Sequence, residues 1–214
     1  MIDLQSESWR QLRVFGADAV TFLQGQLTQD LLQQETGWTL LLHPDGSVLT
    51  AARFARLPEG IALDLPSSVA ERAVTRLKRF ILRVDVALEI GDHVTVDAAE
   101  LVARRWPGGP EAARDLPPHT YGRWVVDQCV SFTKGCFTGQ ELVGRADARG
   151  ATMPWRFCGG QTLDLEGVDA SLKATGPDGP QGVSSFLKVE SGWAWRGFIH
   201  RTAIEGRADL EFVA

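Results

Sequence analysis

The part of the sequence most suited to chemistry is residues 131–145, which read SFTKGCFTGQELVGR. It contains Cys136, and Lys134 lies two positions earlier. A helix start is predicted just after this cysteine. A nearby cation and the positive end of a helix dipole both favour a thiolate over a thiol. The pattern therefore predicts that Cys136 is the most reactive cysteine of the chain; the alternative is a small buried hydrophobic side chain, the usual state of a single cysteine.

The spacing in this stretch also predicts the local backbone. Thr138 and Glu141 are three positions apart, as in a capping box, so a helix is expected to begin at Gly139. Gly135 and Gly139 allow turns that a residue with a side chain would resist. Glu141 can instead serve only as a helix cap, and Arg145 can pair with it one turn later or point into a cavity.

Composition restricts the class of protein. The chain has 214 residues, of which 44% are hydrophobic and 23% charged, as is ordinary for a globular protein. Its formal net charge of -5 disfavours stable binding of nucleic acid by the surface as a whole. No apolar run is long enough to span a membrane, and the amino end lacks the pattern of a secretory signal.

The cysteines and the known catalytic motifs restrict the chemistry further. Cys129, Cys136 and Cys158 include no C-x-x-C pair, which disfavours a disulfide framework and a thiolate zinc site, and no metal is expected. A cytoplasmic location is expected because unpaired thiols persist in a reducing compartment. The sequence has no G-x-S-x-G elbow, P-loop or H-E-x-x-H helix.

Hydrophobic periodicity predicts alternating strands and helices in the first part of the chain. Asp18 is expected to cap a helix that follows the first strand, and Gly25 indicates an early end of that helix or a close backbone approach. Residues 68–83 give the clearest helix, with Ser68 and Glu71 as a capping box. The expected strands cover residues 9–16, two runs within 38–57 that a turn at 44–47 joins, and 84–90.

The second part of the chain has a different pattern. Residues 106–118 are rich in proline and glycine and are expected to form a surface excursion. Residues 151–214 show short alternating runs, with strands expected at 182–189 and 192–200 and a turn at 177–180. No helical periodicity of useful length is found there, so a small β unit is predicted.

Five stretches of the chain match the pattern of one family, in the same order. The most specific is KGCFTGQE, residues 134–141, which fills every fixed position of K-G-C-[YF]-x-G-Q-E. The other four are GADAVTFLQGQLTQDL, HPDGSVLTAARF, LKRFILRVDVALEI and GVSSFLKVESGWAWRGFIHR. The chain resembles the YgfZ family of folate-binding proteins, which are relatives of the aminomethyltransferase (T-protein) of the glycine cleavage system.

This resemblance implies a fold and a function. The fold is α+β, with a shortened ferredoxin-like folate-binding domain over residues 1–148 and a small C-terminal β-barrel over residues 149–214. The function is that of an accessory protein that binds tetrahydrofolate or a derivative and supports iron–sulfur cluster assembly or repair, including in enzymes that thiolate tRNA. The implied partners are the folate and iron–sulfur client or assembly proteins, with no stable nucleic-acid binding and no membrane.

The resemblance also assigns residues. Cys136 is the cysteine that the family needs for its role, and Lys134 would adjust its reactivity. Gln140 and Glu141 would hold the loop or touch the ligand, together with Arg145. Trp9 stands seven positions before the glycine of the G-A-D segment, where the family has a tryptophan that contacts folate; the alternative is a core aromatic at a strand start.

A second basic feature has three interpretations. Arg72, Arg76, Arg79 and Arg83 recur every three or four positions on the side of the 68–83 helix opposite its apolar residues. They can be a solvated helix face, they can receive the carboxylates of a folate tail, or they can meet the backbone of an RNA.

Three departures from the family pattern limit the transfer of function. Residues 46–52 contain no carboxylate, whereas aminomethyltransferases have a catalytic acid there, so aminomethyl transfer is not expected. The segment between Ile90 and the KGC motif is short, and residues 106–110, WPGGP, lack an acid found in many relatives. The alternatives are a folate-dependent one-carbon transferase, or a binding module of the same fold that has lost its ligand.

Overall fold

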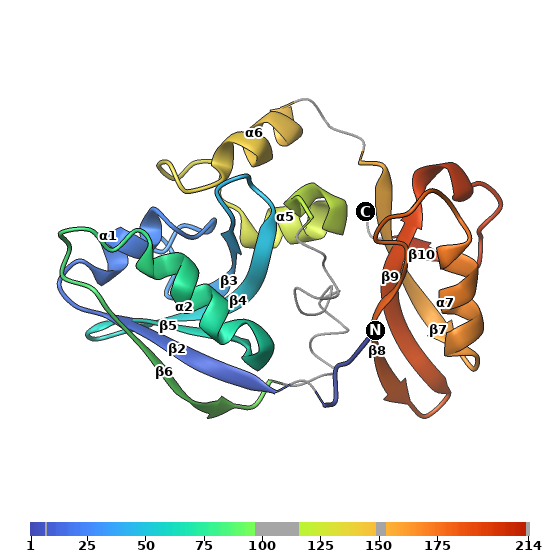
Figure 1. Cartoon of the computed structure of the whole chain (residues 1–214), viewed down its shortest axis with the longest axis horizontal. Coiled ribbons are helices and arrows are strands. Elements are labelled where there is room, and N and C mark those ends of the chain that lie inside the picture. Colours follow the sequence, from blue (N-terminus) through green and yellow to red (C-terminus); the bar gives the residue numbers. More distant parts are fainter. Residues whose placement is uncertain (7, 97–115, 149–152, 213–214) are drawn as a thin grey trace.

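Two sheets with helices packed around them make up the described part of the chain (Figure 1). The computed structural model describes residues 1–6, 8–96, 116–148 and 153–212. In Figure 1 the first sheet lies on the left and the second on the right, and the helices of residues 116–148 lie between and above them. Within the described ranges, no helix is long and apolar enough to cross a membrane.

The first sheet is antiparallel, with the strand order β3-β4-β5-β2-β6. α1 (Ala19–Gln24) follows β2, and α2 (Ala70–Lys78) follows β5 after a 3₁₀ turn. Apart from β3, this is the strand-helix-strand-strand-helix-strand order of the ferredoxin-like motif. The strands are β2 (Trp9–Phe15), β3 (Thr36–Leu42), β4 (Val48–Leu57), β5 (Gly60–Pro66) and β6 (Ala87–Val94).

Each face of the first sheet is covered by its own apolar cluster. Leu12 and Phe54 are fully buried in the cluster that α1 and α2 form with one face, and Leu77 of α2 belongs to it. Trp9 and Leu40 belong to the cluster of the other face, which α5 (Arg123–Cys129) covers. This division follows from the two-residue period of a strand, which turns successive side chains to opposite faces.

The second sheet has the strand order β1-β8-β9-β7-β10. All its pairs are antiparallel except β1 with β8, so the amino end of the chain completes the sheet formed by its carboxyl end. Among the described residues no pairing joins β1 to β10, so closure of the expected barrel is not confirmed. The strands are β1 (Ile2–Asp3), β7 (Trp155–Thr162), β8 (Gly182–Val189), β9 (Gly192–His200) and β10 (Glu211–Phe212), and α7 (Leu165–Lys173) packs on β8 and β9.

Residues 116–148 join the two sheets. They contain the 3₁₀ helix Pro118–Tyr121, α5, and α6 (Gln140–Ala148). The Tyr121 ring meets the rings of Phe157 and Phe198, with centroids 6.4 and 5.6 Å away, and so ties this connection to the second sheet. The same apolar cluster holds Trp9 of the first sheet, so one core spans both sheets. The expected division after residue 148 stays a prediction.

Most of the expected elements of the first part are confirmed, but the 68–83 helix is shorter than predicted. α2 begins at Ala70 and ends at Lys78, and Val69 is its N-cap without any side-chain hydrogen bond, so the expected capping box is wrong. Beyond α2 the chain makes tight turns, and Arg83 has a left-handed φ of 58° that no helix tolerates.

The described part of residues 151–214 is not purely β, as had been expected. The strands at 182–189 and 192–200 are confirmed, but α7 lies before them. Asp164 begins this helix by accepting a hydrogen bond from the Gly167 N–H at 2.9 Å. Only Asp169 and Leu172 of the helix are buried, which gives too few apolar positions for a visible helical period. The expected excursion at 106–118 lies mostly outside the described residues.

Candidate functional site

Two stretches that match the YgfZ pattern lie against each other. We name residues 25–29, just after α1, the 25–29 segment, and residues 131–139, just before α6, the Cys136 loop. Hydrogen bonds join them across 113 residues of sequence: the N–H of Thr138 donates to the carbonyl of Gly25 at 3.0 Å. The N–H of Ser131 donates to the carbonyl of Thr28 at 2.9 Å. The two strongest motif matches are therefore one structural unit.

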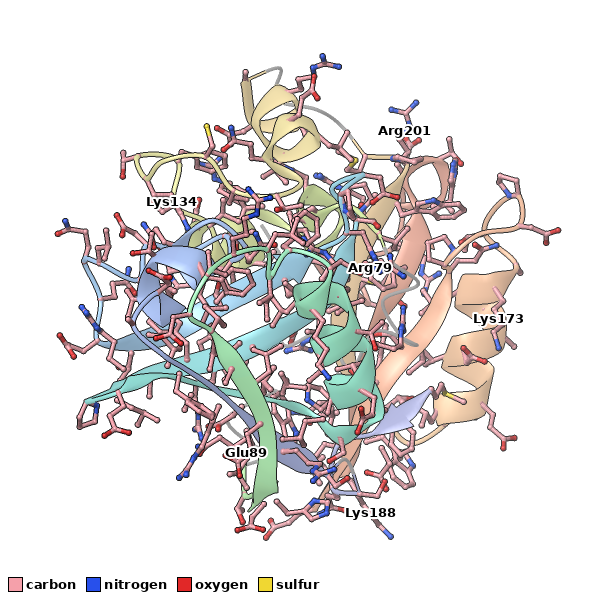
Figure 2. The ribbon with its side chains drawn as sticks, turned by 60° about the vertical axis from the view of Figure 1, so that its left-hand side comes forward. Arg79, Glu89, Lys134, Lys173, Lys188 and Arg201 are labelled. Carbon is pink, nitrogen blue, oxygen red and sulfur yellow. The ribbon has the colours of Figure 1, made fainter. Side chains whose placement is uncertain are left out.

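Lys134 provides the charged part of this attachment. Its Nζ donates to the carbonyls of Leu27 at 2.8 Å and Gln29 at 2.9 Å, and it lies 5.4 Å from the centroid of the Phe137 ring. Burial lowers the pKa of Lys134 to about 8, and the Asp30 carboxylate acts in the opposite direction. Lys134 lies by the loop that leads into α6 (Figure 2). Its ammonium thus holds the backbone of the loop, and an influence on the Cys136 thiol stays a prediction.

Because α1 ends early, the backbone carbonyls of the 25–29 segment are not used within a helix and can accept hydrogen bonds from elsewhere. The helix ends at Gly25, as the sequence predicts, and the chain then runs along β3, where Leu27 pairs with Leu41 as an isolated bridge. The carbonyls of the segment need donors, because buried backbone groups left without a partner are costly. The Cys136 loop supplies these donors, so its position follows from the satisfaction of backbone groups.

The start of α6 is held differently from the prediction. The helix begins at Gln140, but the Thr138 hydroxyl bonds to the carbonyl of Gly25 and the side chain of Gln26 at 3.4 and 3.3 Å. Gln140 accepts the N–H of Phe137 at 3.1 Å and so closes the turn. The expected capping box is therefore wrong: the residue directly before the helix is Gly139 with its positive φ, and Thr138 bonds to the 25–29 segment instead.

Of the two glycines that flank Cys136, only one needs to be glycine. Gly139 has a φ of 85°, and a Cβ there would lie 2.7 Å from the carbonyl oxygen of His43 and 3.1 Å from Cα of Gly46. A Cβ on Gly135 would meet nothing within 4 Å, and its φ is not positive. The expectation of a backbone turn that requires glycine is confirmed for Gly139 and wrong for Gly135.

The three cysteines differ sharply in exposure. Cys136 is exposed, whereas Cys129 and Cys158 are buried. Burial raises the pKa of Cys129 to about 12, and burial likewise raises that of Cys158 to about 12. Since the thiolate is the reactive form, these two thiols are inert in the folded protein.

The side chains around the Cys136 loop line an open pocket of about 360 Å³. This volume is within the range of small-molecule sites. Glu141 and Arg145 form an ion pair across one turn of α6 and keep side-chain exposures of 76% and 65%, so both can reach a ligand. The lining residues are Ser131, Phe132, Lys134, Phe137, Gln140, Glu141, Gly144 and Arg145.

Trp9 is not part of this pocket. It is 2% exposed at the start of β2, and its ring makes an edge contact with Trp38 at a centroid distance of 6.3 Å. The structure thus brings four of the six residues that the sequence predicts for the site, Lys134, Gln140, Glu141 and Arg145, into one pocket. It places Cys136 in the same loop and Trp9 in the core.

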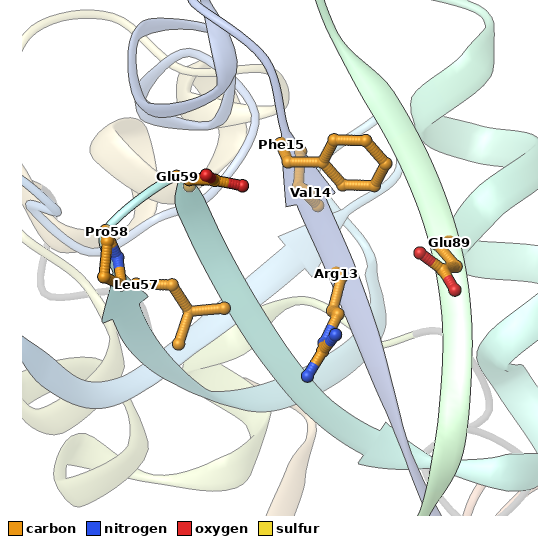
Figure 3. A pocket seen from close by; sticks show the side chains of 8 residues that line it. Arg13, Val14, Phe15, Leu57, Pro58, Glu59 and Glu89 are labelled. Carbon is orange, nitrogen blue, oxygen red and sulfur yellow. The ribbon is translucent and has the colours of Figure 1, made fainter.

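A larger open pocket of about 520 Å³ lies away from these residues, at the end of the first sheet (Figure 3). Arg13 and Phe15 of β2, Glu59 of the β4–β5 turn and Glu89 of β6 line it (Figure 3). No residue that the sequence analysis selects for chemistry is present there. Because it is remote from the Cys136 loop, this pocket is a reference surface where a charge can be removed as a control.

Comparison with known proteins finds relatives in sequence and one protein with the same fold. No family model matches the chain. An uncharacterized protein of Haemophilus influenzae is 26% identical, and the match covers 67% of this chain and 68% of that protein. The tRNA-modifying protein YgfZ of Edwardsiella ictaluri is 25% identical over 69% of this chain and 67% of its own length. The aminomethyltransferase T of the glycine cleavage system from Bartonella henselae has the same fold, with a TM-score of 0.56 and 14% identity over 91% of this chain and 76% of that one.

The chain is similar in sequence to YgfZ and shares the fold of the T-protein. Sequence reasoning on this YgfZ-like chain missed the partners of the Cys136 loop, the carbonyls of Gly25, Leu27, Thr28 and Gln29. Every residue has a backbone carbonyl, so residue types do not indicate which carbonyls accept these hydrogen bonds. The one signal in the sequence was that both motif matches, around residues 25–29 and 134–141, are present in the same chain. Their joint presence does not show that they are in contact.

The flanking glycines give a test of the loop geometry. Gly139→Ala is expected to lower the free energy of unfolding by about 1–3 kcal/mol, because alanine resists a positive φ and meets the His43 carbonyl. Gly135→Ala is expected to change it little, or to raise it by up to about 1 kcal/mol, because the site is open and the unfolded chain loses freedom. Urea denaturation of the two variants measures both; equal losses would contradict the assigned backbone.

The exposure difference predicts the order of thiol modification. At pH 8 an alkylating reagent should modify one cysteine, Cys136, in a fast phase, while Cys129 and Cys158, whose pKa values are raised by burial, should react only after unfolding. Mass spectrometry of peptides against time identifies the site. The Cys136→Ser variant is the control and should lack the fast phase. A fast phase at Cys129 or Cys158 would show that the core opens.

Proposed function

We propose that this chain is a YgfZ-type accessory protein that binds a reduced folate and supports iron–sulfur cluster assembly or repair, with Cys136 as its reactive thiol. The observation that carries the proposal is the packing of the Cys136 loop on the 25–29 segment. This contact presents the exposed cysteine of the chain beside a pocket of small-molecule size. The relatedness to YgfZ and the shared fold of the T-protein support the same interpretation.

The pocket offers suitable groups for a folate. Phe132 and Phe137 provide aromatic surface for a flat ring, a contact worth about 0.5–1.5 kcal/mol beyond area burial. Gln140 and Glu141 offer acceptors for the amino groups of a pterin, and the guanidinium of Arg145 can pair with a carboxylate of the tail. Tetrahydrofolate, or a derivative of it, is therefore the proposed ligand.

Trp9 contributes to this site by packing. Its ring lies in the buried cluster that also contains Phe137, the residue that anchors the Cys136 loop to the core. Trp9 and the Cys136 loop therefore share one core. A direct contact with folate, as the resemblance implies, stays a prediction.

The strand that follows the β3–β4 turn argues against aminomethyl transfer. Residues 46–52 carry no acidic side chain, and Val48, Leu49 and Ala52 among them are buried. A general acid or a carboxylate that stabilises an iminium ion is therefore missing at this position. The proposed role is accordingly one of binding and of thiol chemistry at Cys136, and the client is an iron–sulfur protein.

Folate binding is tested by calorimetric titration with tetrahydrofolate. We expect Glu141→Gln to weaken binding by roughly tenfold, because a charge-assisted hydrogen bond becomes a neutral one. Glu89→Gln is the matched control, since it removes the same charge at the reference surface of Figure 3 and should leave affinity unchanged. Equal affinities of the two variants would show that folate does not bind in this pocket. Absence of binding heat with the wild-type chain would favour a module that has lost its ligand.

The iron–sulfur role is tested in a bacterial strain that lacks its YgfZ. The chain should restore the thiolated nucleosides of tRNA, which mass spectrometry of digested tRNA measures. Cys136→Ser should fall to the level of the strain without the chain. Cys158→Ala removes a buried thiol from the second sheet and should retain restoration. Full restoration by Cys136→Ser would exclude the thiol from the function.

A further inference from the structure

A third pocket, of about 270 Å³, lies on the arginine-bearing side of α2. It is lined by His43 of the β3–β4 turn, Leu49 of β4, and Glu71, Arg72, Thr75, Arg76 and Arg79 of the α2 region. Arg79, near the end of α2, is labelled in Figure 2. None of these residues lines the pocket beside the Cys136 loop.

The floor of this pocket is a buried arginine. Arg76 is only 3% exposed, which contradicts a purely solvated arginine face on this helix. Its Nε donates to the carbonyl of Leu42 at 3.0 Å and its Nη1 to Gln26 at 2.9 Å, while its Cζ lies 4.3 Å from the centroid of the Phe80 ring. These contacts fix the plane and the direction of the guanidinium.

One donor of this guanidinium has no partner. Nη2 of Arg76 is buried and makes no hydrogen bond to any described residue. Within the described ranges no carboxylate forms an ion pair with Arg76 or with the neighbouring Arg79. A buried arginine without an anionic partner is unfavourable, so proteins rarely keep one unless an anion completes it. Burial, and then the charge of Arg79, lower the pKa of Arg76. Both effects show that the charged form of Arg76 lacks a compensating negative charge.

The charge balance of the pocket indicates the kind of anion. Three guanidinium groups, those of Arg72, Arg76 and Arg79, face a single carboxylate, that of Glu71. Two of these guanidinium groups, those of Arg76 and Arg79, have no carboxylate partner among the described residues, and a phosphate dianion would neutralise their two charges. Arginine forks match the oxygen spacing of phosphate, and several of them can share its oxygens. The volume exceeds that of a bare phosphate and leaves room for a small organic group beside Leu49.

We propose that this pocket binds the phosphate group of a small phosphorylated molecule, with Arg76 as its buried floor and Arg72 and Arg79 as its exposed rim. The site is separate from the folate pocket and does not depend on the proposed function. Gln26 links it physically to that pocket, because it accepts from Arg76 and also from the Thr138 hydroxyl of the Cys136 loop.

The site is tested on the full chain by titration with inorganic phosphate, with succinate as a dianion of similar charge and a short RNA as a polyanion. Amide shifts in nuclear magnetic resonance spectra are followed at constant ionic strength. Phosphate should give saturable shifts over Thr75–Arg79, with a Kd of roughly 1 mM or lower, and should bind at least about tenfold more tightly than succinate. Shifts confined to α7 would overturn the proposal.

Two variants distinguish phosphate binding in the pocket from nonspecific attraction to the positive charge of α2. Arg79→Gln should weaken phosphate binding by about tenfold, because it removes one rim donor and leaves the buried floor intact. Lys78→Gln removes the same charge from the adjacent position of α2, outside the pocket, and should change the Kd by less than about twofold. Equal effects of both variants, tighter binding of succinate, binding of RNA alone, or no saturable shift in the wild type would each overturn the proposal.

Discussion

The need of the 25–29 segment for hydrogen-bond donors is the constraint on which the rest of the site depends. α1 ends after six residues, and the chain continues with carbonyls that β3 does not use. Backbone donors and one ammonium of the Cys136 loop meet these carbonyls. Hydrogen bonds from an ionised donor such as this ammonium are stronger than bonds between neutral groups. The position of Cys136 is therefore a consequence of backbone satisfaction more than of side-chain packing.

The same segment also connects three parts of the molecule that are distant in sequence. Gln26 lies between the buried guanidinium of α2 and the Thr138 hydroxyl before α6. Thr28 bonds through its hydroxyl to the carbonyl of Cys129 at the end of α5. The 25–29 segment thus fixes the relative positions of α2, α5 and the Cys136 loop. The shapes of the Cys136-loop pocket and of the α2 pocket depend on these positions.

The second sheet has a different part in this arrangement. It receives β1 from the amino end of the chain and contributes Phe157 and Phe198 to the cluster that contains Trp9. Burial of aromatic rings at this junction makes the connection between the sheets part of the core. The 3₁₀ helix Pro118–Tyr121, α5 and α6 are the described elements that connect the sheets, and the open pocket beside the Cys136 loop lies on this connection.

Elements with a clear hydrophobic period could be predicted well, and those with a weak one could not. β8 and β9 match the expected ranges because their short alternating runs are visible in the sequence. α7 was missed because only Asp169 and Leu172 of it are buried. Both predicted capping boxes are wrong, since spacing alone does not exclude other partners: Thr138 bonds to the distant residues Gly25 and Gln26, and Val69 takes the N-cap of α2.

The sequence by itself determined which residues can do chemistry, because the identity and order of a motif are properties of the chain. It supplied Cys136, its glycine and lysine neighbours, and the polar side chains of the following helix turn. Only the tertiary structure decided that Cys136 is exposed while Cys129 and Cys158 are buried, and that Arg76 is buried on the side of α2 that looked solvated. Exposure and hydrogen-bond partners are set by segments distant in sequence, 34 and 50 residues away for Arg76 and 107 residues away for Lys134 and Leu27, and no local pattern records those contacts.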